Sequence, residues 1–173
     1  MTTTDSITHI STLATHTALS AWAMANDFFI VLVLLVILFL FAWYIGHGPF
    51  VGLLFAFYAA YAIYVTFPYT SLLPVTPALT AFLAHAGLYI AFVLIFFIIL
   101  RHVIISDFLY IGKIGLAALS FLGAAFLIAI AYHVFSLSPI YQFTPAVAAL
   151  FTPEKYFFWW FSGPAVGLLF FAH

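Results

Sequence analysis

The stretch that decides the fold runs from Phe28 to Ile45 and reads FFIVLVLLVILFLFAWYI. It contains no charged side chain, no proline and no glycine. A helix of about 20 mostly apolar residues is long enough to cross the roughly 30 Å hydrocarbon core of a bilayer. We therefore predict that this stretch forms a membrane-spanning helix.

The composition of the whole chain agrees with that prediction. Of its 173 residues, 68% are hydrophobic and only 4% are charged, whereas a soluble domain carries about 25% charged residues. Three basic and four acidic side chains are too few to solvate a globular surface of this size. The composition excludes a soluble enzyme, a nucleic-acid-binding protein and a disordered chain, and it predicts a polytopic membrane protein whose first partner is the lipid bilayer.

Four further stretches are apolar enough to form membrane spans. The shortest, Tyr156 to Ala172, contains Ser162, Gly163 and Pro164, which predict a kink or a partial crossing. We expect an all-α protein, a polytopic helical membrane bundle of about five transmembrane helices, with a single membrane domain over residues 28–173. The other three predicted spans are Phe50–Phe67, Ala78–Leu100 and Gly112–Phe135.

Proline and glycine mark the connections between these helices. The sequence Gly46-His47-Gly48-Pro49 predicts a tight connection, with Pro49 in the first turn of the next helix. Thr144-Pro145 and Thr152-Pro153 each predict a helix start. A short helix from Pro145 to Phe151 is therefore expected on the membrane surface or as a shallow re-entrant turn.

The few charged residues support two predictions. Acidic side chains are favourable at helix starts, and Ser106-Asp107 predicts the N-cap of the fourth helical run. Arg101 and Lys113 lie in or beside the third loop, against Lys155 on the other side. Because basic residues favour the cytoplasmic side, loops one and three of this cytoplasmic-membrane protein are expected in the cytoplasm and the N-terminus outside. Three acidic residues are interpreted as caps or first-turn residues: Asp27, Asp107 and Glu154.

Residues 1–27 differ from the rest of the chain because they are rich in Ser, Thr and small side chains. Ile7, Ile10, Ala14 and Trp22 fall on one helical face, which favours an interfacial helix ending near Asn26-Asp27. A flexible tail is the alternative, and the sequence does not separate the two.

Histidine is unusually frequent among the ionisable side chains. His85 lies about two turns into the third predicted span, and His133 lies near the end of the fourth. Two histidines on facing helices can hold haem iron or, with further ligands, zinc. In the alternative interpretation each histidine is hydrogen-bonded to water or to a loop carbonyl. The chain has no cysteine, no Cys-x-x-Cys-His motif and no His-Glu-x-x-His motif, so we expect no metal site and no bound cofactor.

Small residues predict where helices pack. Helices in lipid associate through small side chains that let their backbones approach closely. The second span carries such residues at spacings of four, and the fifth carries Gly163-x-x-x-Gly167. We predict that the second span is central and packs along this row against another helix of the chain or of a neighbouring subunit. The row consists of Gly48, Gly52, Ala56 and Ala60.

A short part of the chain resembles a known family. Asn26-Asp27, the aliphatic first span, Gly46-His47-Gly48-Pro49-Phe50 and the alanine-rich second span are similar to the start of the colicin V production (CvpA-like) membrane proteins. The resemblance covers residues 26–67. It departs from the family at His47 and Pro49, where the family carries Arg or Lys. The resemblance implies a small multi-span inner-membrane protein linked to secretion or envelope processes.

Three functions are compatible with the sequence. We favour an integral protein of the cytoplasmic membrane without a catalytic site, acting as an assembly, scaffold or accessory component that binds itself or other membrane proteins. The first alternative is a haem- or metal-binding redox subunit that uses His85 and His133. The second is a small channel or permease, which is disfavoured because none of the predicted spans contains Asp or Glu.

Overall fold

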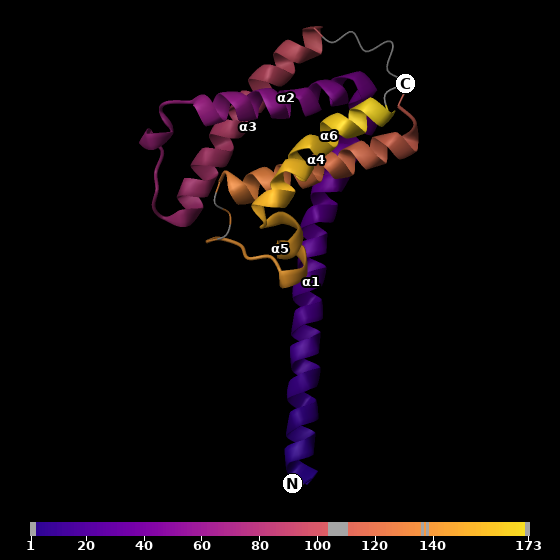
Figure 1. Ribbon diagram of the computed structural model, residues 1–173, viewed down its shortest axis with the longest axis vertical. Helices are drawn as coiled ribbons and strands as arrows, with labels where there is room; N and C mark the ends of the chain where they lie inside the picture. Colours follow the sequence, from indigo (N-terminus) through magenta and orange to yellow (C-terminus); the bar gives the residue numbers. More distant parts are fainter. Residues whose placement is uncertain (1–2, 104–110, 136, 138, 172–173) are drawn as a thin grey trace.

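A computed structural model describes residues 3–103, 111–135, 137 and 139–171 of the chain (Figure 1). The described residues form six α-helices and one short 3-10 helix, and they contain no strand. The all-α fold predicted from the sequence is confirmed. The helices are α1 (Thr3–Ile45), α2 (His47–Thr66), the 3-10 helix η1 (Thr70–Leu72), α3 (Ala78–Val103), α4 (Lys113–His133), α5 (Pro145–Phe151) and α6 (Glu154–Phe171).

Four of the described helices are long and apolar enough to cross a membrane. They are residues Met24–Ile45 of α1 and the whole of α2, α3 and α4. The fifth predicted span forms α6, an 18-residue helix with Pro164 inside it, which is not among these four. The polytopic helical membrane bundle predicted from the sequence is thus present in its main elements.

The predicted connections agree with the structure. Gly46 is the single residue between α1 and α2, and its φ of 103° is one that only glycine adopts readily. Pro49 lies in the first turn of α2. The short helix α5 begins at Pro145 and ends at Phe151 as predicted, and Glu154 lies in the first turn of α6. Ser106-Asp107 lies outside the described residues, and α4 begins at Lys113.

The first helix is longer than the sequence predicts. It begins at Thr3 and continues without a break to Ile45, so no helix ends at Asn26-Asp27. The interpretation of Asp27 as a cap or first-turn residue is therefore wrong, because Asp27 lies in the helix interior. Figure 1 shows the N-terminal half of α1 extending away from the other helices.

The remaining helices assemble in neighbouring pairs. Helix α2 packs most closely against α3, α4 against α6, and α1 against α4 and α2. Helix α6 runs back along α4, since Phe157 packs on His133 near the end of α4 while Phe171 contacts Gly115 near its start. The two helices therefore extend over the same depth of the bundle.

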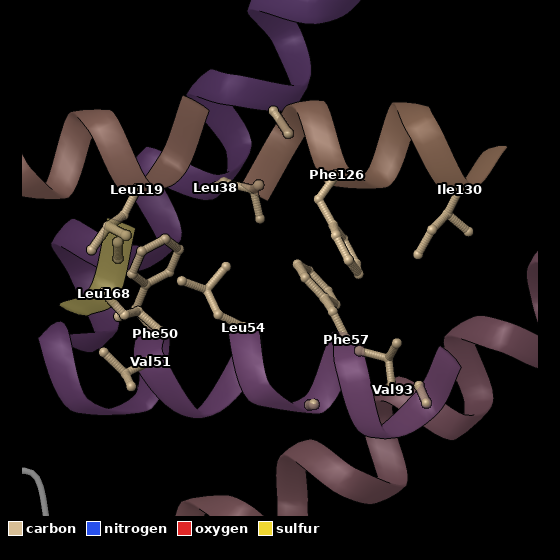
Figure 2. Packing of buried hydrophobic residues seen from close by; sticks show 14 of the residues in the cluster. Leu38, Phe50, Val51, Leu54, Phe57, Val93, Leu119, Phe126, Ile130 and Leu168 are labelled. Carbon is tan, nitrogen blue, oxygen red and sulfur yellow. The ribbon is translucent and has the colours of Figure 1, made fainter. Parts of the chain in front are cut away.

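Large side chains fill the space between α2 and α4. Figure 2 shows Phe50, Leu54 and Phe57 of α2 pointing toward Phe126 and Leu119 of α4. Phe57 and Phe126 stack with ring centroids 6.0 Å apart. Side chains from the other helices close this core: Leu38 of α1, Val93 of α3 and Leu168 of α6.

Candidate functional site

The one buried carboxylate among the described side chains is Asp27. It is 1% exposed although it lies on α1, most of whose described side chains are exposed. The Tyr141 hydroxyl donates to Asp27 Oδ1 at 2.6 Å. The Thr144 backbone N–H and hydroxyl both donate to Asp27 Oδ2, each at 2.6 Å. Asp27 therefore ties α1 to the segment that precedes α5.

The surroundings of Asp27 complete this polar cluster. The Asn26 side-chain amide donates to the Tyr141 hydroxyl at 2.9 Å, so Tyr141 both accepts and donates. The hydrogen bond to Asp27 and partial burial raise the pKa of Tyr141 above its ordinary value, which keeps the phenol protonated and able to donate. Three charge-assisted bonds satisfy the carboxylate. The arrangement joins α1 to the segment before α5 through hydrogen bonds.

His85 belongs to an aromatic cluster between α3 and α2. Its Nδ1 lies 2.7 Å from the hydroxyl of Tyr64 on α2. The Tyr64 ring also packs edge-on against Tyr89 and Phe135. Next to it, the Tyr89 hydroxyl donates to the backbone oxygen of Phe57 at 3.0 Å. His85 and Tyr89 thus each contribute a polar contact that joins α3 to α2.

His133 has different partners. Its Nε2 lies 2.8 Å from the backbone oxygen of Phe151, the last residue of α5. A carbonyl can only accept, so Nε2 carries the proton. The His133 ring packs against Phe157 of α6. The structure therefore gives His85 and His133 separate bonding partners on separate helix pairs, and cofactor binding by the two stays a prediction. Within the described parts of the chain, no three His, Asp or Glu side chains group closely enough to hold a metal ion.

Tyr58 forms a further polar contact, at the proline of α6. Its hydroxyl donates to the backbone oxygen of Phe161 at 2.5 Å and accepts from the backbone N–H of Ala165 at 3.3 Å. A regular helix would pair that oxygen and that N–H with each other. The hydroxyl of an α2 side chain is thus inserted into the hydrogen-bond ladder of α6 beside Pro164, a known way to bend a helix.

The residues predicted to pack helices lie mainly in buried positions. All four of the row Gly48, Gly52, Ala56 and Ala60 are buried. Tyr64 continues the row four residues later and bonds to His85 of α3. On α6, a Cβ added to Gly167 would lie 2.7 Å from Leu122, and one added to Gly163 would lie 3.2 Å from the same side chain.

A cavity of about 600 Å³ lies among α1, α3, α4 and the segment after α4. Its lining is apolar except for two tyrosines, and both hydroxyls bond elsewhere, Tyr89 to Phe57 and Tyr141 to Asp27. The size is typical of sites for small ligands. The apolar lining residues include Leu34, Phe82, Ala86, Val93, Leu127 and Ala131.

Sequence reasoning missed the Asp27 cluster and the cavity. Asp27 is 114 residues from Tyr141 and 117 from Thr144, and no local pattern connects such distant residues. The available signal was a carboxylate directly before an uninterrupted apolar stretch, where an unpaired charge is unfavourable. No protein-family model, curated protein or solved structure matches this chain. The similarity to the colicin V production proteins stays a prediction.

Proposed function

We propose that this chain is a multi-pass accessory or assembly component of the cytoplasmic membrane that binds other proteins through the projecting part of α1. The observation that carries the proposal is the length of α1. Its 43 residues extend over about 65 Å at 1.5 Å per residue, whereas the hydrocarbon core is about 30 Å thick. A helix that crosses once therefore continues well beyond the bilayer, where it can contact a partner.

The polar contacts inside the bundle support a structural role. Asp27, Tyr89 and His133 each bond to a different element from their own. Among the described residues, every buried side-chain nitrogen or oxygen has a hydrogen-bond partner. Catalytic groups need a free lone pair or a transferable proton directed toward substrate. These polar groups are instead engaged in joining helices.

We further propose that the N-terminus lies outside and that α6 completes a fifth crossing. The Lys113 ammonium lies 5.5 Å from the Trp43 ring centroid, so the start of α4 is next to the end of α1. Asp27 bonds to Tyr141, so the segment after α4 is next to the start of the first span. These two contacts fit loops one and three on one side of the membrane. Because α6 runs along α4, it covers the same depth.

Impermeant maleimide labelling tests this orientation. A cysteine introduced at residue 10 should react in intact cells, and cysteines introduced in the segment 102–107 should react only after permeabilisation. The opposite pattern would reverse the topology. A cysteine at residue 173 that reacts in intact cells would reject the fifth crossing.

The accessory role is tested by breaking α1 outside the bilayer. Proline in a helix interior costs about 3 kcal/mol, so Ala14→Pro should interrupt the projecting helix, whereas Ala14→Leu should preserve it. Native mass spectrometry of the protein extracted from its own membrane should show a second polypeptide at fixed stoichiometry for the wild type and Ala14→Leu. Ala14→Pro should lose that polypeptide while the bundle keeps its unfolding midpoint. Identical composition in all three samples would contradict the role.

A further inference from the structure

We propose that the cavity among α1, α3 and α4 is a binding site for one acyl chain of a membrane lipid. The site requires that the protein lies in a membrane, and it does not depend on the accessory role proposed for the protein. Four observations carry it: the chemistry of the lining, the shape of the cavity, the position of its opening and the polar cluster of Asn26, Asp27 and Tyr141 beside it.

The lining excludes a polar ligand. Every lining side chain is apolar except Tyr89 and Tyr141, whose hydroxyls are bonded to Phe57 and Asp27. A buried water needs two to four polar partners, which this wall does not offer. An empty cavity would forfeit the dispersion contacts of its lining. A hydrocarbon group is the occupant that this surface accommodates best.

The shape fits an extended chain. The lining on α3 runs from Phe82 to Val93, which is about 16 Å along the helix axis. That length is close to half of the roughly 30 Å hydrocarbon core, the thickness of one leaflet. The cavity therefore suits one extended acyl chain.

The cavity opens toward the lipid-facing surface. Three of its lining residues are exposed, with Ile30 at 37%, Leu83 at 59% and Ile90 at 55%. They come from α1 and α3, and α3 packs chiefly on α2, which leaves the space beside α1 unfilled. Leu94 and Ile98 extend the exposed apolar surface along α3. The acyl chain of a lipid in the surrounding bilayer can therefore enter the cavity sideways without crossing a polar barrier.

The polar cluster around Asp27 indicates the direction in which the bound acyl chain lies. Tyr141 lines the cavity and bonds to Asn26 and Asp27, at the start of the first span. Tyrosine and other amphipathic side chains are favoured at the interface between membrane and water. The lipid headgroup is therefore expected near the exposed Asn26, with the acyl chain running from Phe82 toward Val93.

Substitutions that fill the cavity test the site. The wild type, reconstituted with dioleoylphosphatidylcholine and analysed by native mass spectrometry, should retain one phospholipid per chain after stringent detergent exchange. Ala86→Phe and Ala131→Phe place a ring in the lining and should lower that retention at least tenfold. The matched control is Ala91→Phe, at an exposed position on the same helix as Ala86. It should retain lipid as the wild type does, and circular dichroism should show equal helicity in all four proteins.

A second measurement keeps the proposal testable if the filling variants fail to fold. Phosphatidylcholine with a photoreactive diazirine on its acyl chain should label the wild type within residues 82–93. Absence of retained lipid in the wild type, equal retention by the filling variants and the control, or labelling elsewhere would each overturn the site. A wild-type dimer without lipid that becomes monomeric in Ala86→Phe would identify a second copy as the occupant instead. None of these outcomes alters the partner test on α1.

Discussion

The four membrane-length helices divide into an inner pair and an outer pair. Within their most apolar stretches, 50% of α2 and 61% of α4 are buried, against 11% of α1 and 11% of α3. All four are strongly apolar, and each outer helix has a higher mean hydropathy than either inner helix. Since lipid solvates Leu and Ile as well as a protein core does, helix association in a membrane depends on close packing and on hydrogen bonds. The two pairs use these two means in different proportions.

The inner pair buries small residues as well as the large side chains that fill the space between α2 and α4. Gly52 and Ala56 of α2 are buried, and Gly123 of α4 leaves room for Leu54 and Leu38. The outer pair is attached at polar points. Asp27 holds α1 to the segment before α5, and Tyr89 with His85 holds α3 to α2. The small residues of α3 itself, such as Gly87 and Ala91, are exposed.

The largest effect should come from removing the carboxylate of the outer helix α1. In Asp27→Ala, the Thr144 N–H, the Thr144 hydroxyl and the Tyr141 hydroxyl lose their acceptor. Hydrogen bonds to a charged group contribute about 1.5–3 kcal/mol each and are not additive, so the free energy of unfolding should fall by about 3 kcal/mol. Denaturant titration in mixed micelles measures it.

Glu154→Ala is the control for this substitution, since Glu154 is exposed in the first turn of α6. It should cost no more than about 1 kcal/mol. Equal losses for Asp27→Ala and Glu154→Ala would mean that the outer helix is not held by its buried polar group.

The second-largest effect is expected from a substitution on the inner helix α2. Ala56→Leu inserts a large side chain into the buried row, and overpacking of this kind costs about 1–3 kcal/mol. Ala62→Leu makes the same change at an exposed position of α2 and should change the free energy of unfolding by less than about 0.5 kcal/mol. Equal tolerance of both changes would show that the row is not an interface.

The sequence predicted the helices better than it predicted their contacts. Periods of apolar residues and the prolines at 49, 145 and 153 act locally, so the short helix α5 and the approximate limits of the helices after α1 could be derived from them, whereas the start of α1 at Thr3 could not. A spacing of four is also a local pattern, and it marks four residues of α2 that are buried in the structure: Gly48, Gly52, Ala56 and Ala60. The Asp27 contacts and the cavity depend on residues more than 100 positions apart. Their positions follow from how helices pack, which a single sequence does not specify.

The third effect concerns the attachment of α3, the other outer helix. Tyr89→Phe removes the hydroxyl that donates to Phe57 and leaves the ring in place. The net contribution of a neutral hydrogen bond is about 1 kcal/mol, which is the loss expected in the free energy of unfolding. Tyr44→Phe is the control, since Tyr44 is 91% exposed, and it should have no measurable effect. A loss from Tyr44→Phe as large as that from Tyr89→Phe would show that the Tyr89 hydrogen bond does not attach α3 to α2.

The smallest effect is expected at the two histidines, and it separates attachment from cofactor binding. In His85→Gln the new amide can still bond to the Tyr64 hydroxyl, and in His133→Gln it can still donate to the Phe151 oxygen. Each change should therefore cost less than about 1 kcal/mol. Because the two histidines bond to different helices, the losses should add in the double variant. The absorption spectrum and metal content of the purified protein should be the same in the wild type and all three variants. Loss of a stoichiometric haem or metal from both single variants would instead assign His85 and His133 to one cofactor, since only a shared ligand makes two such separate side chains act as a unit.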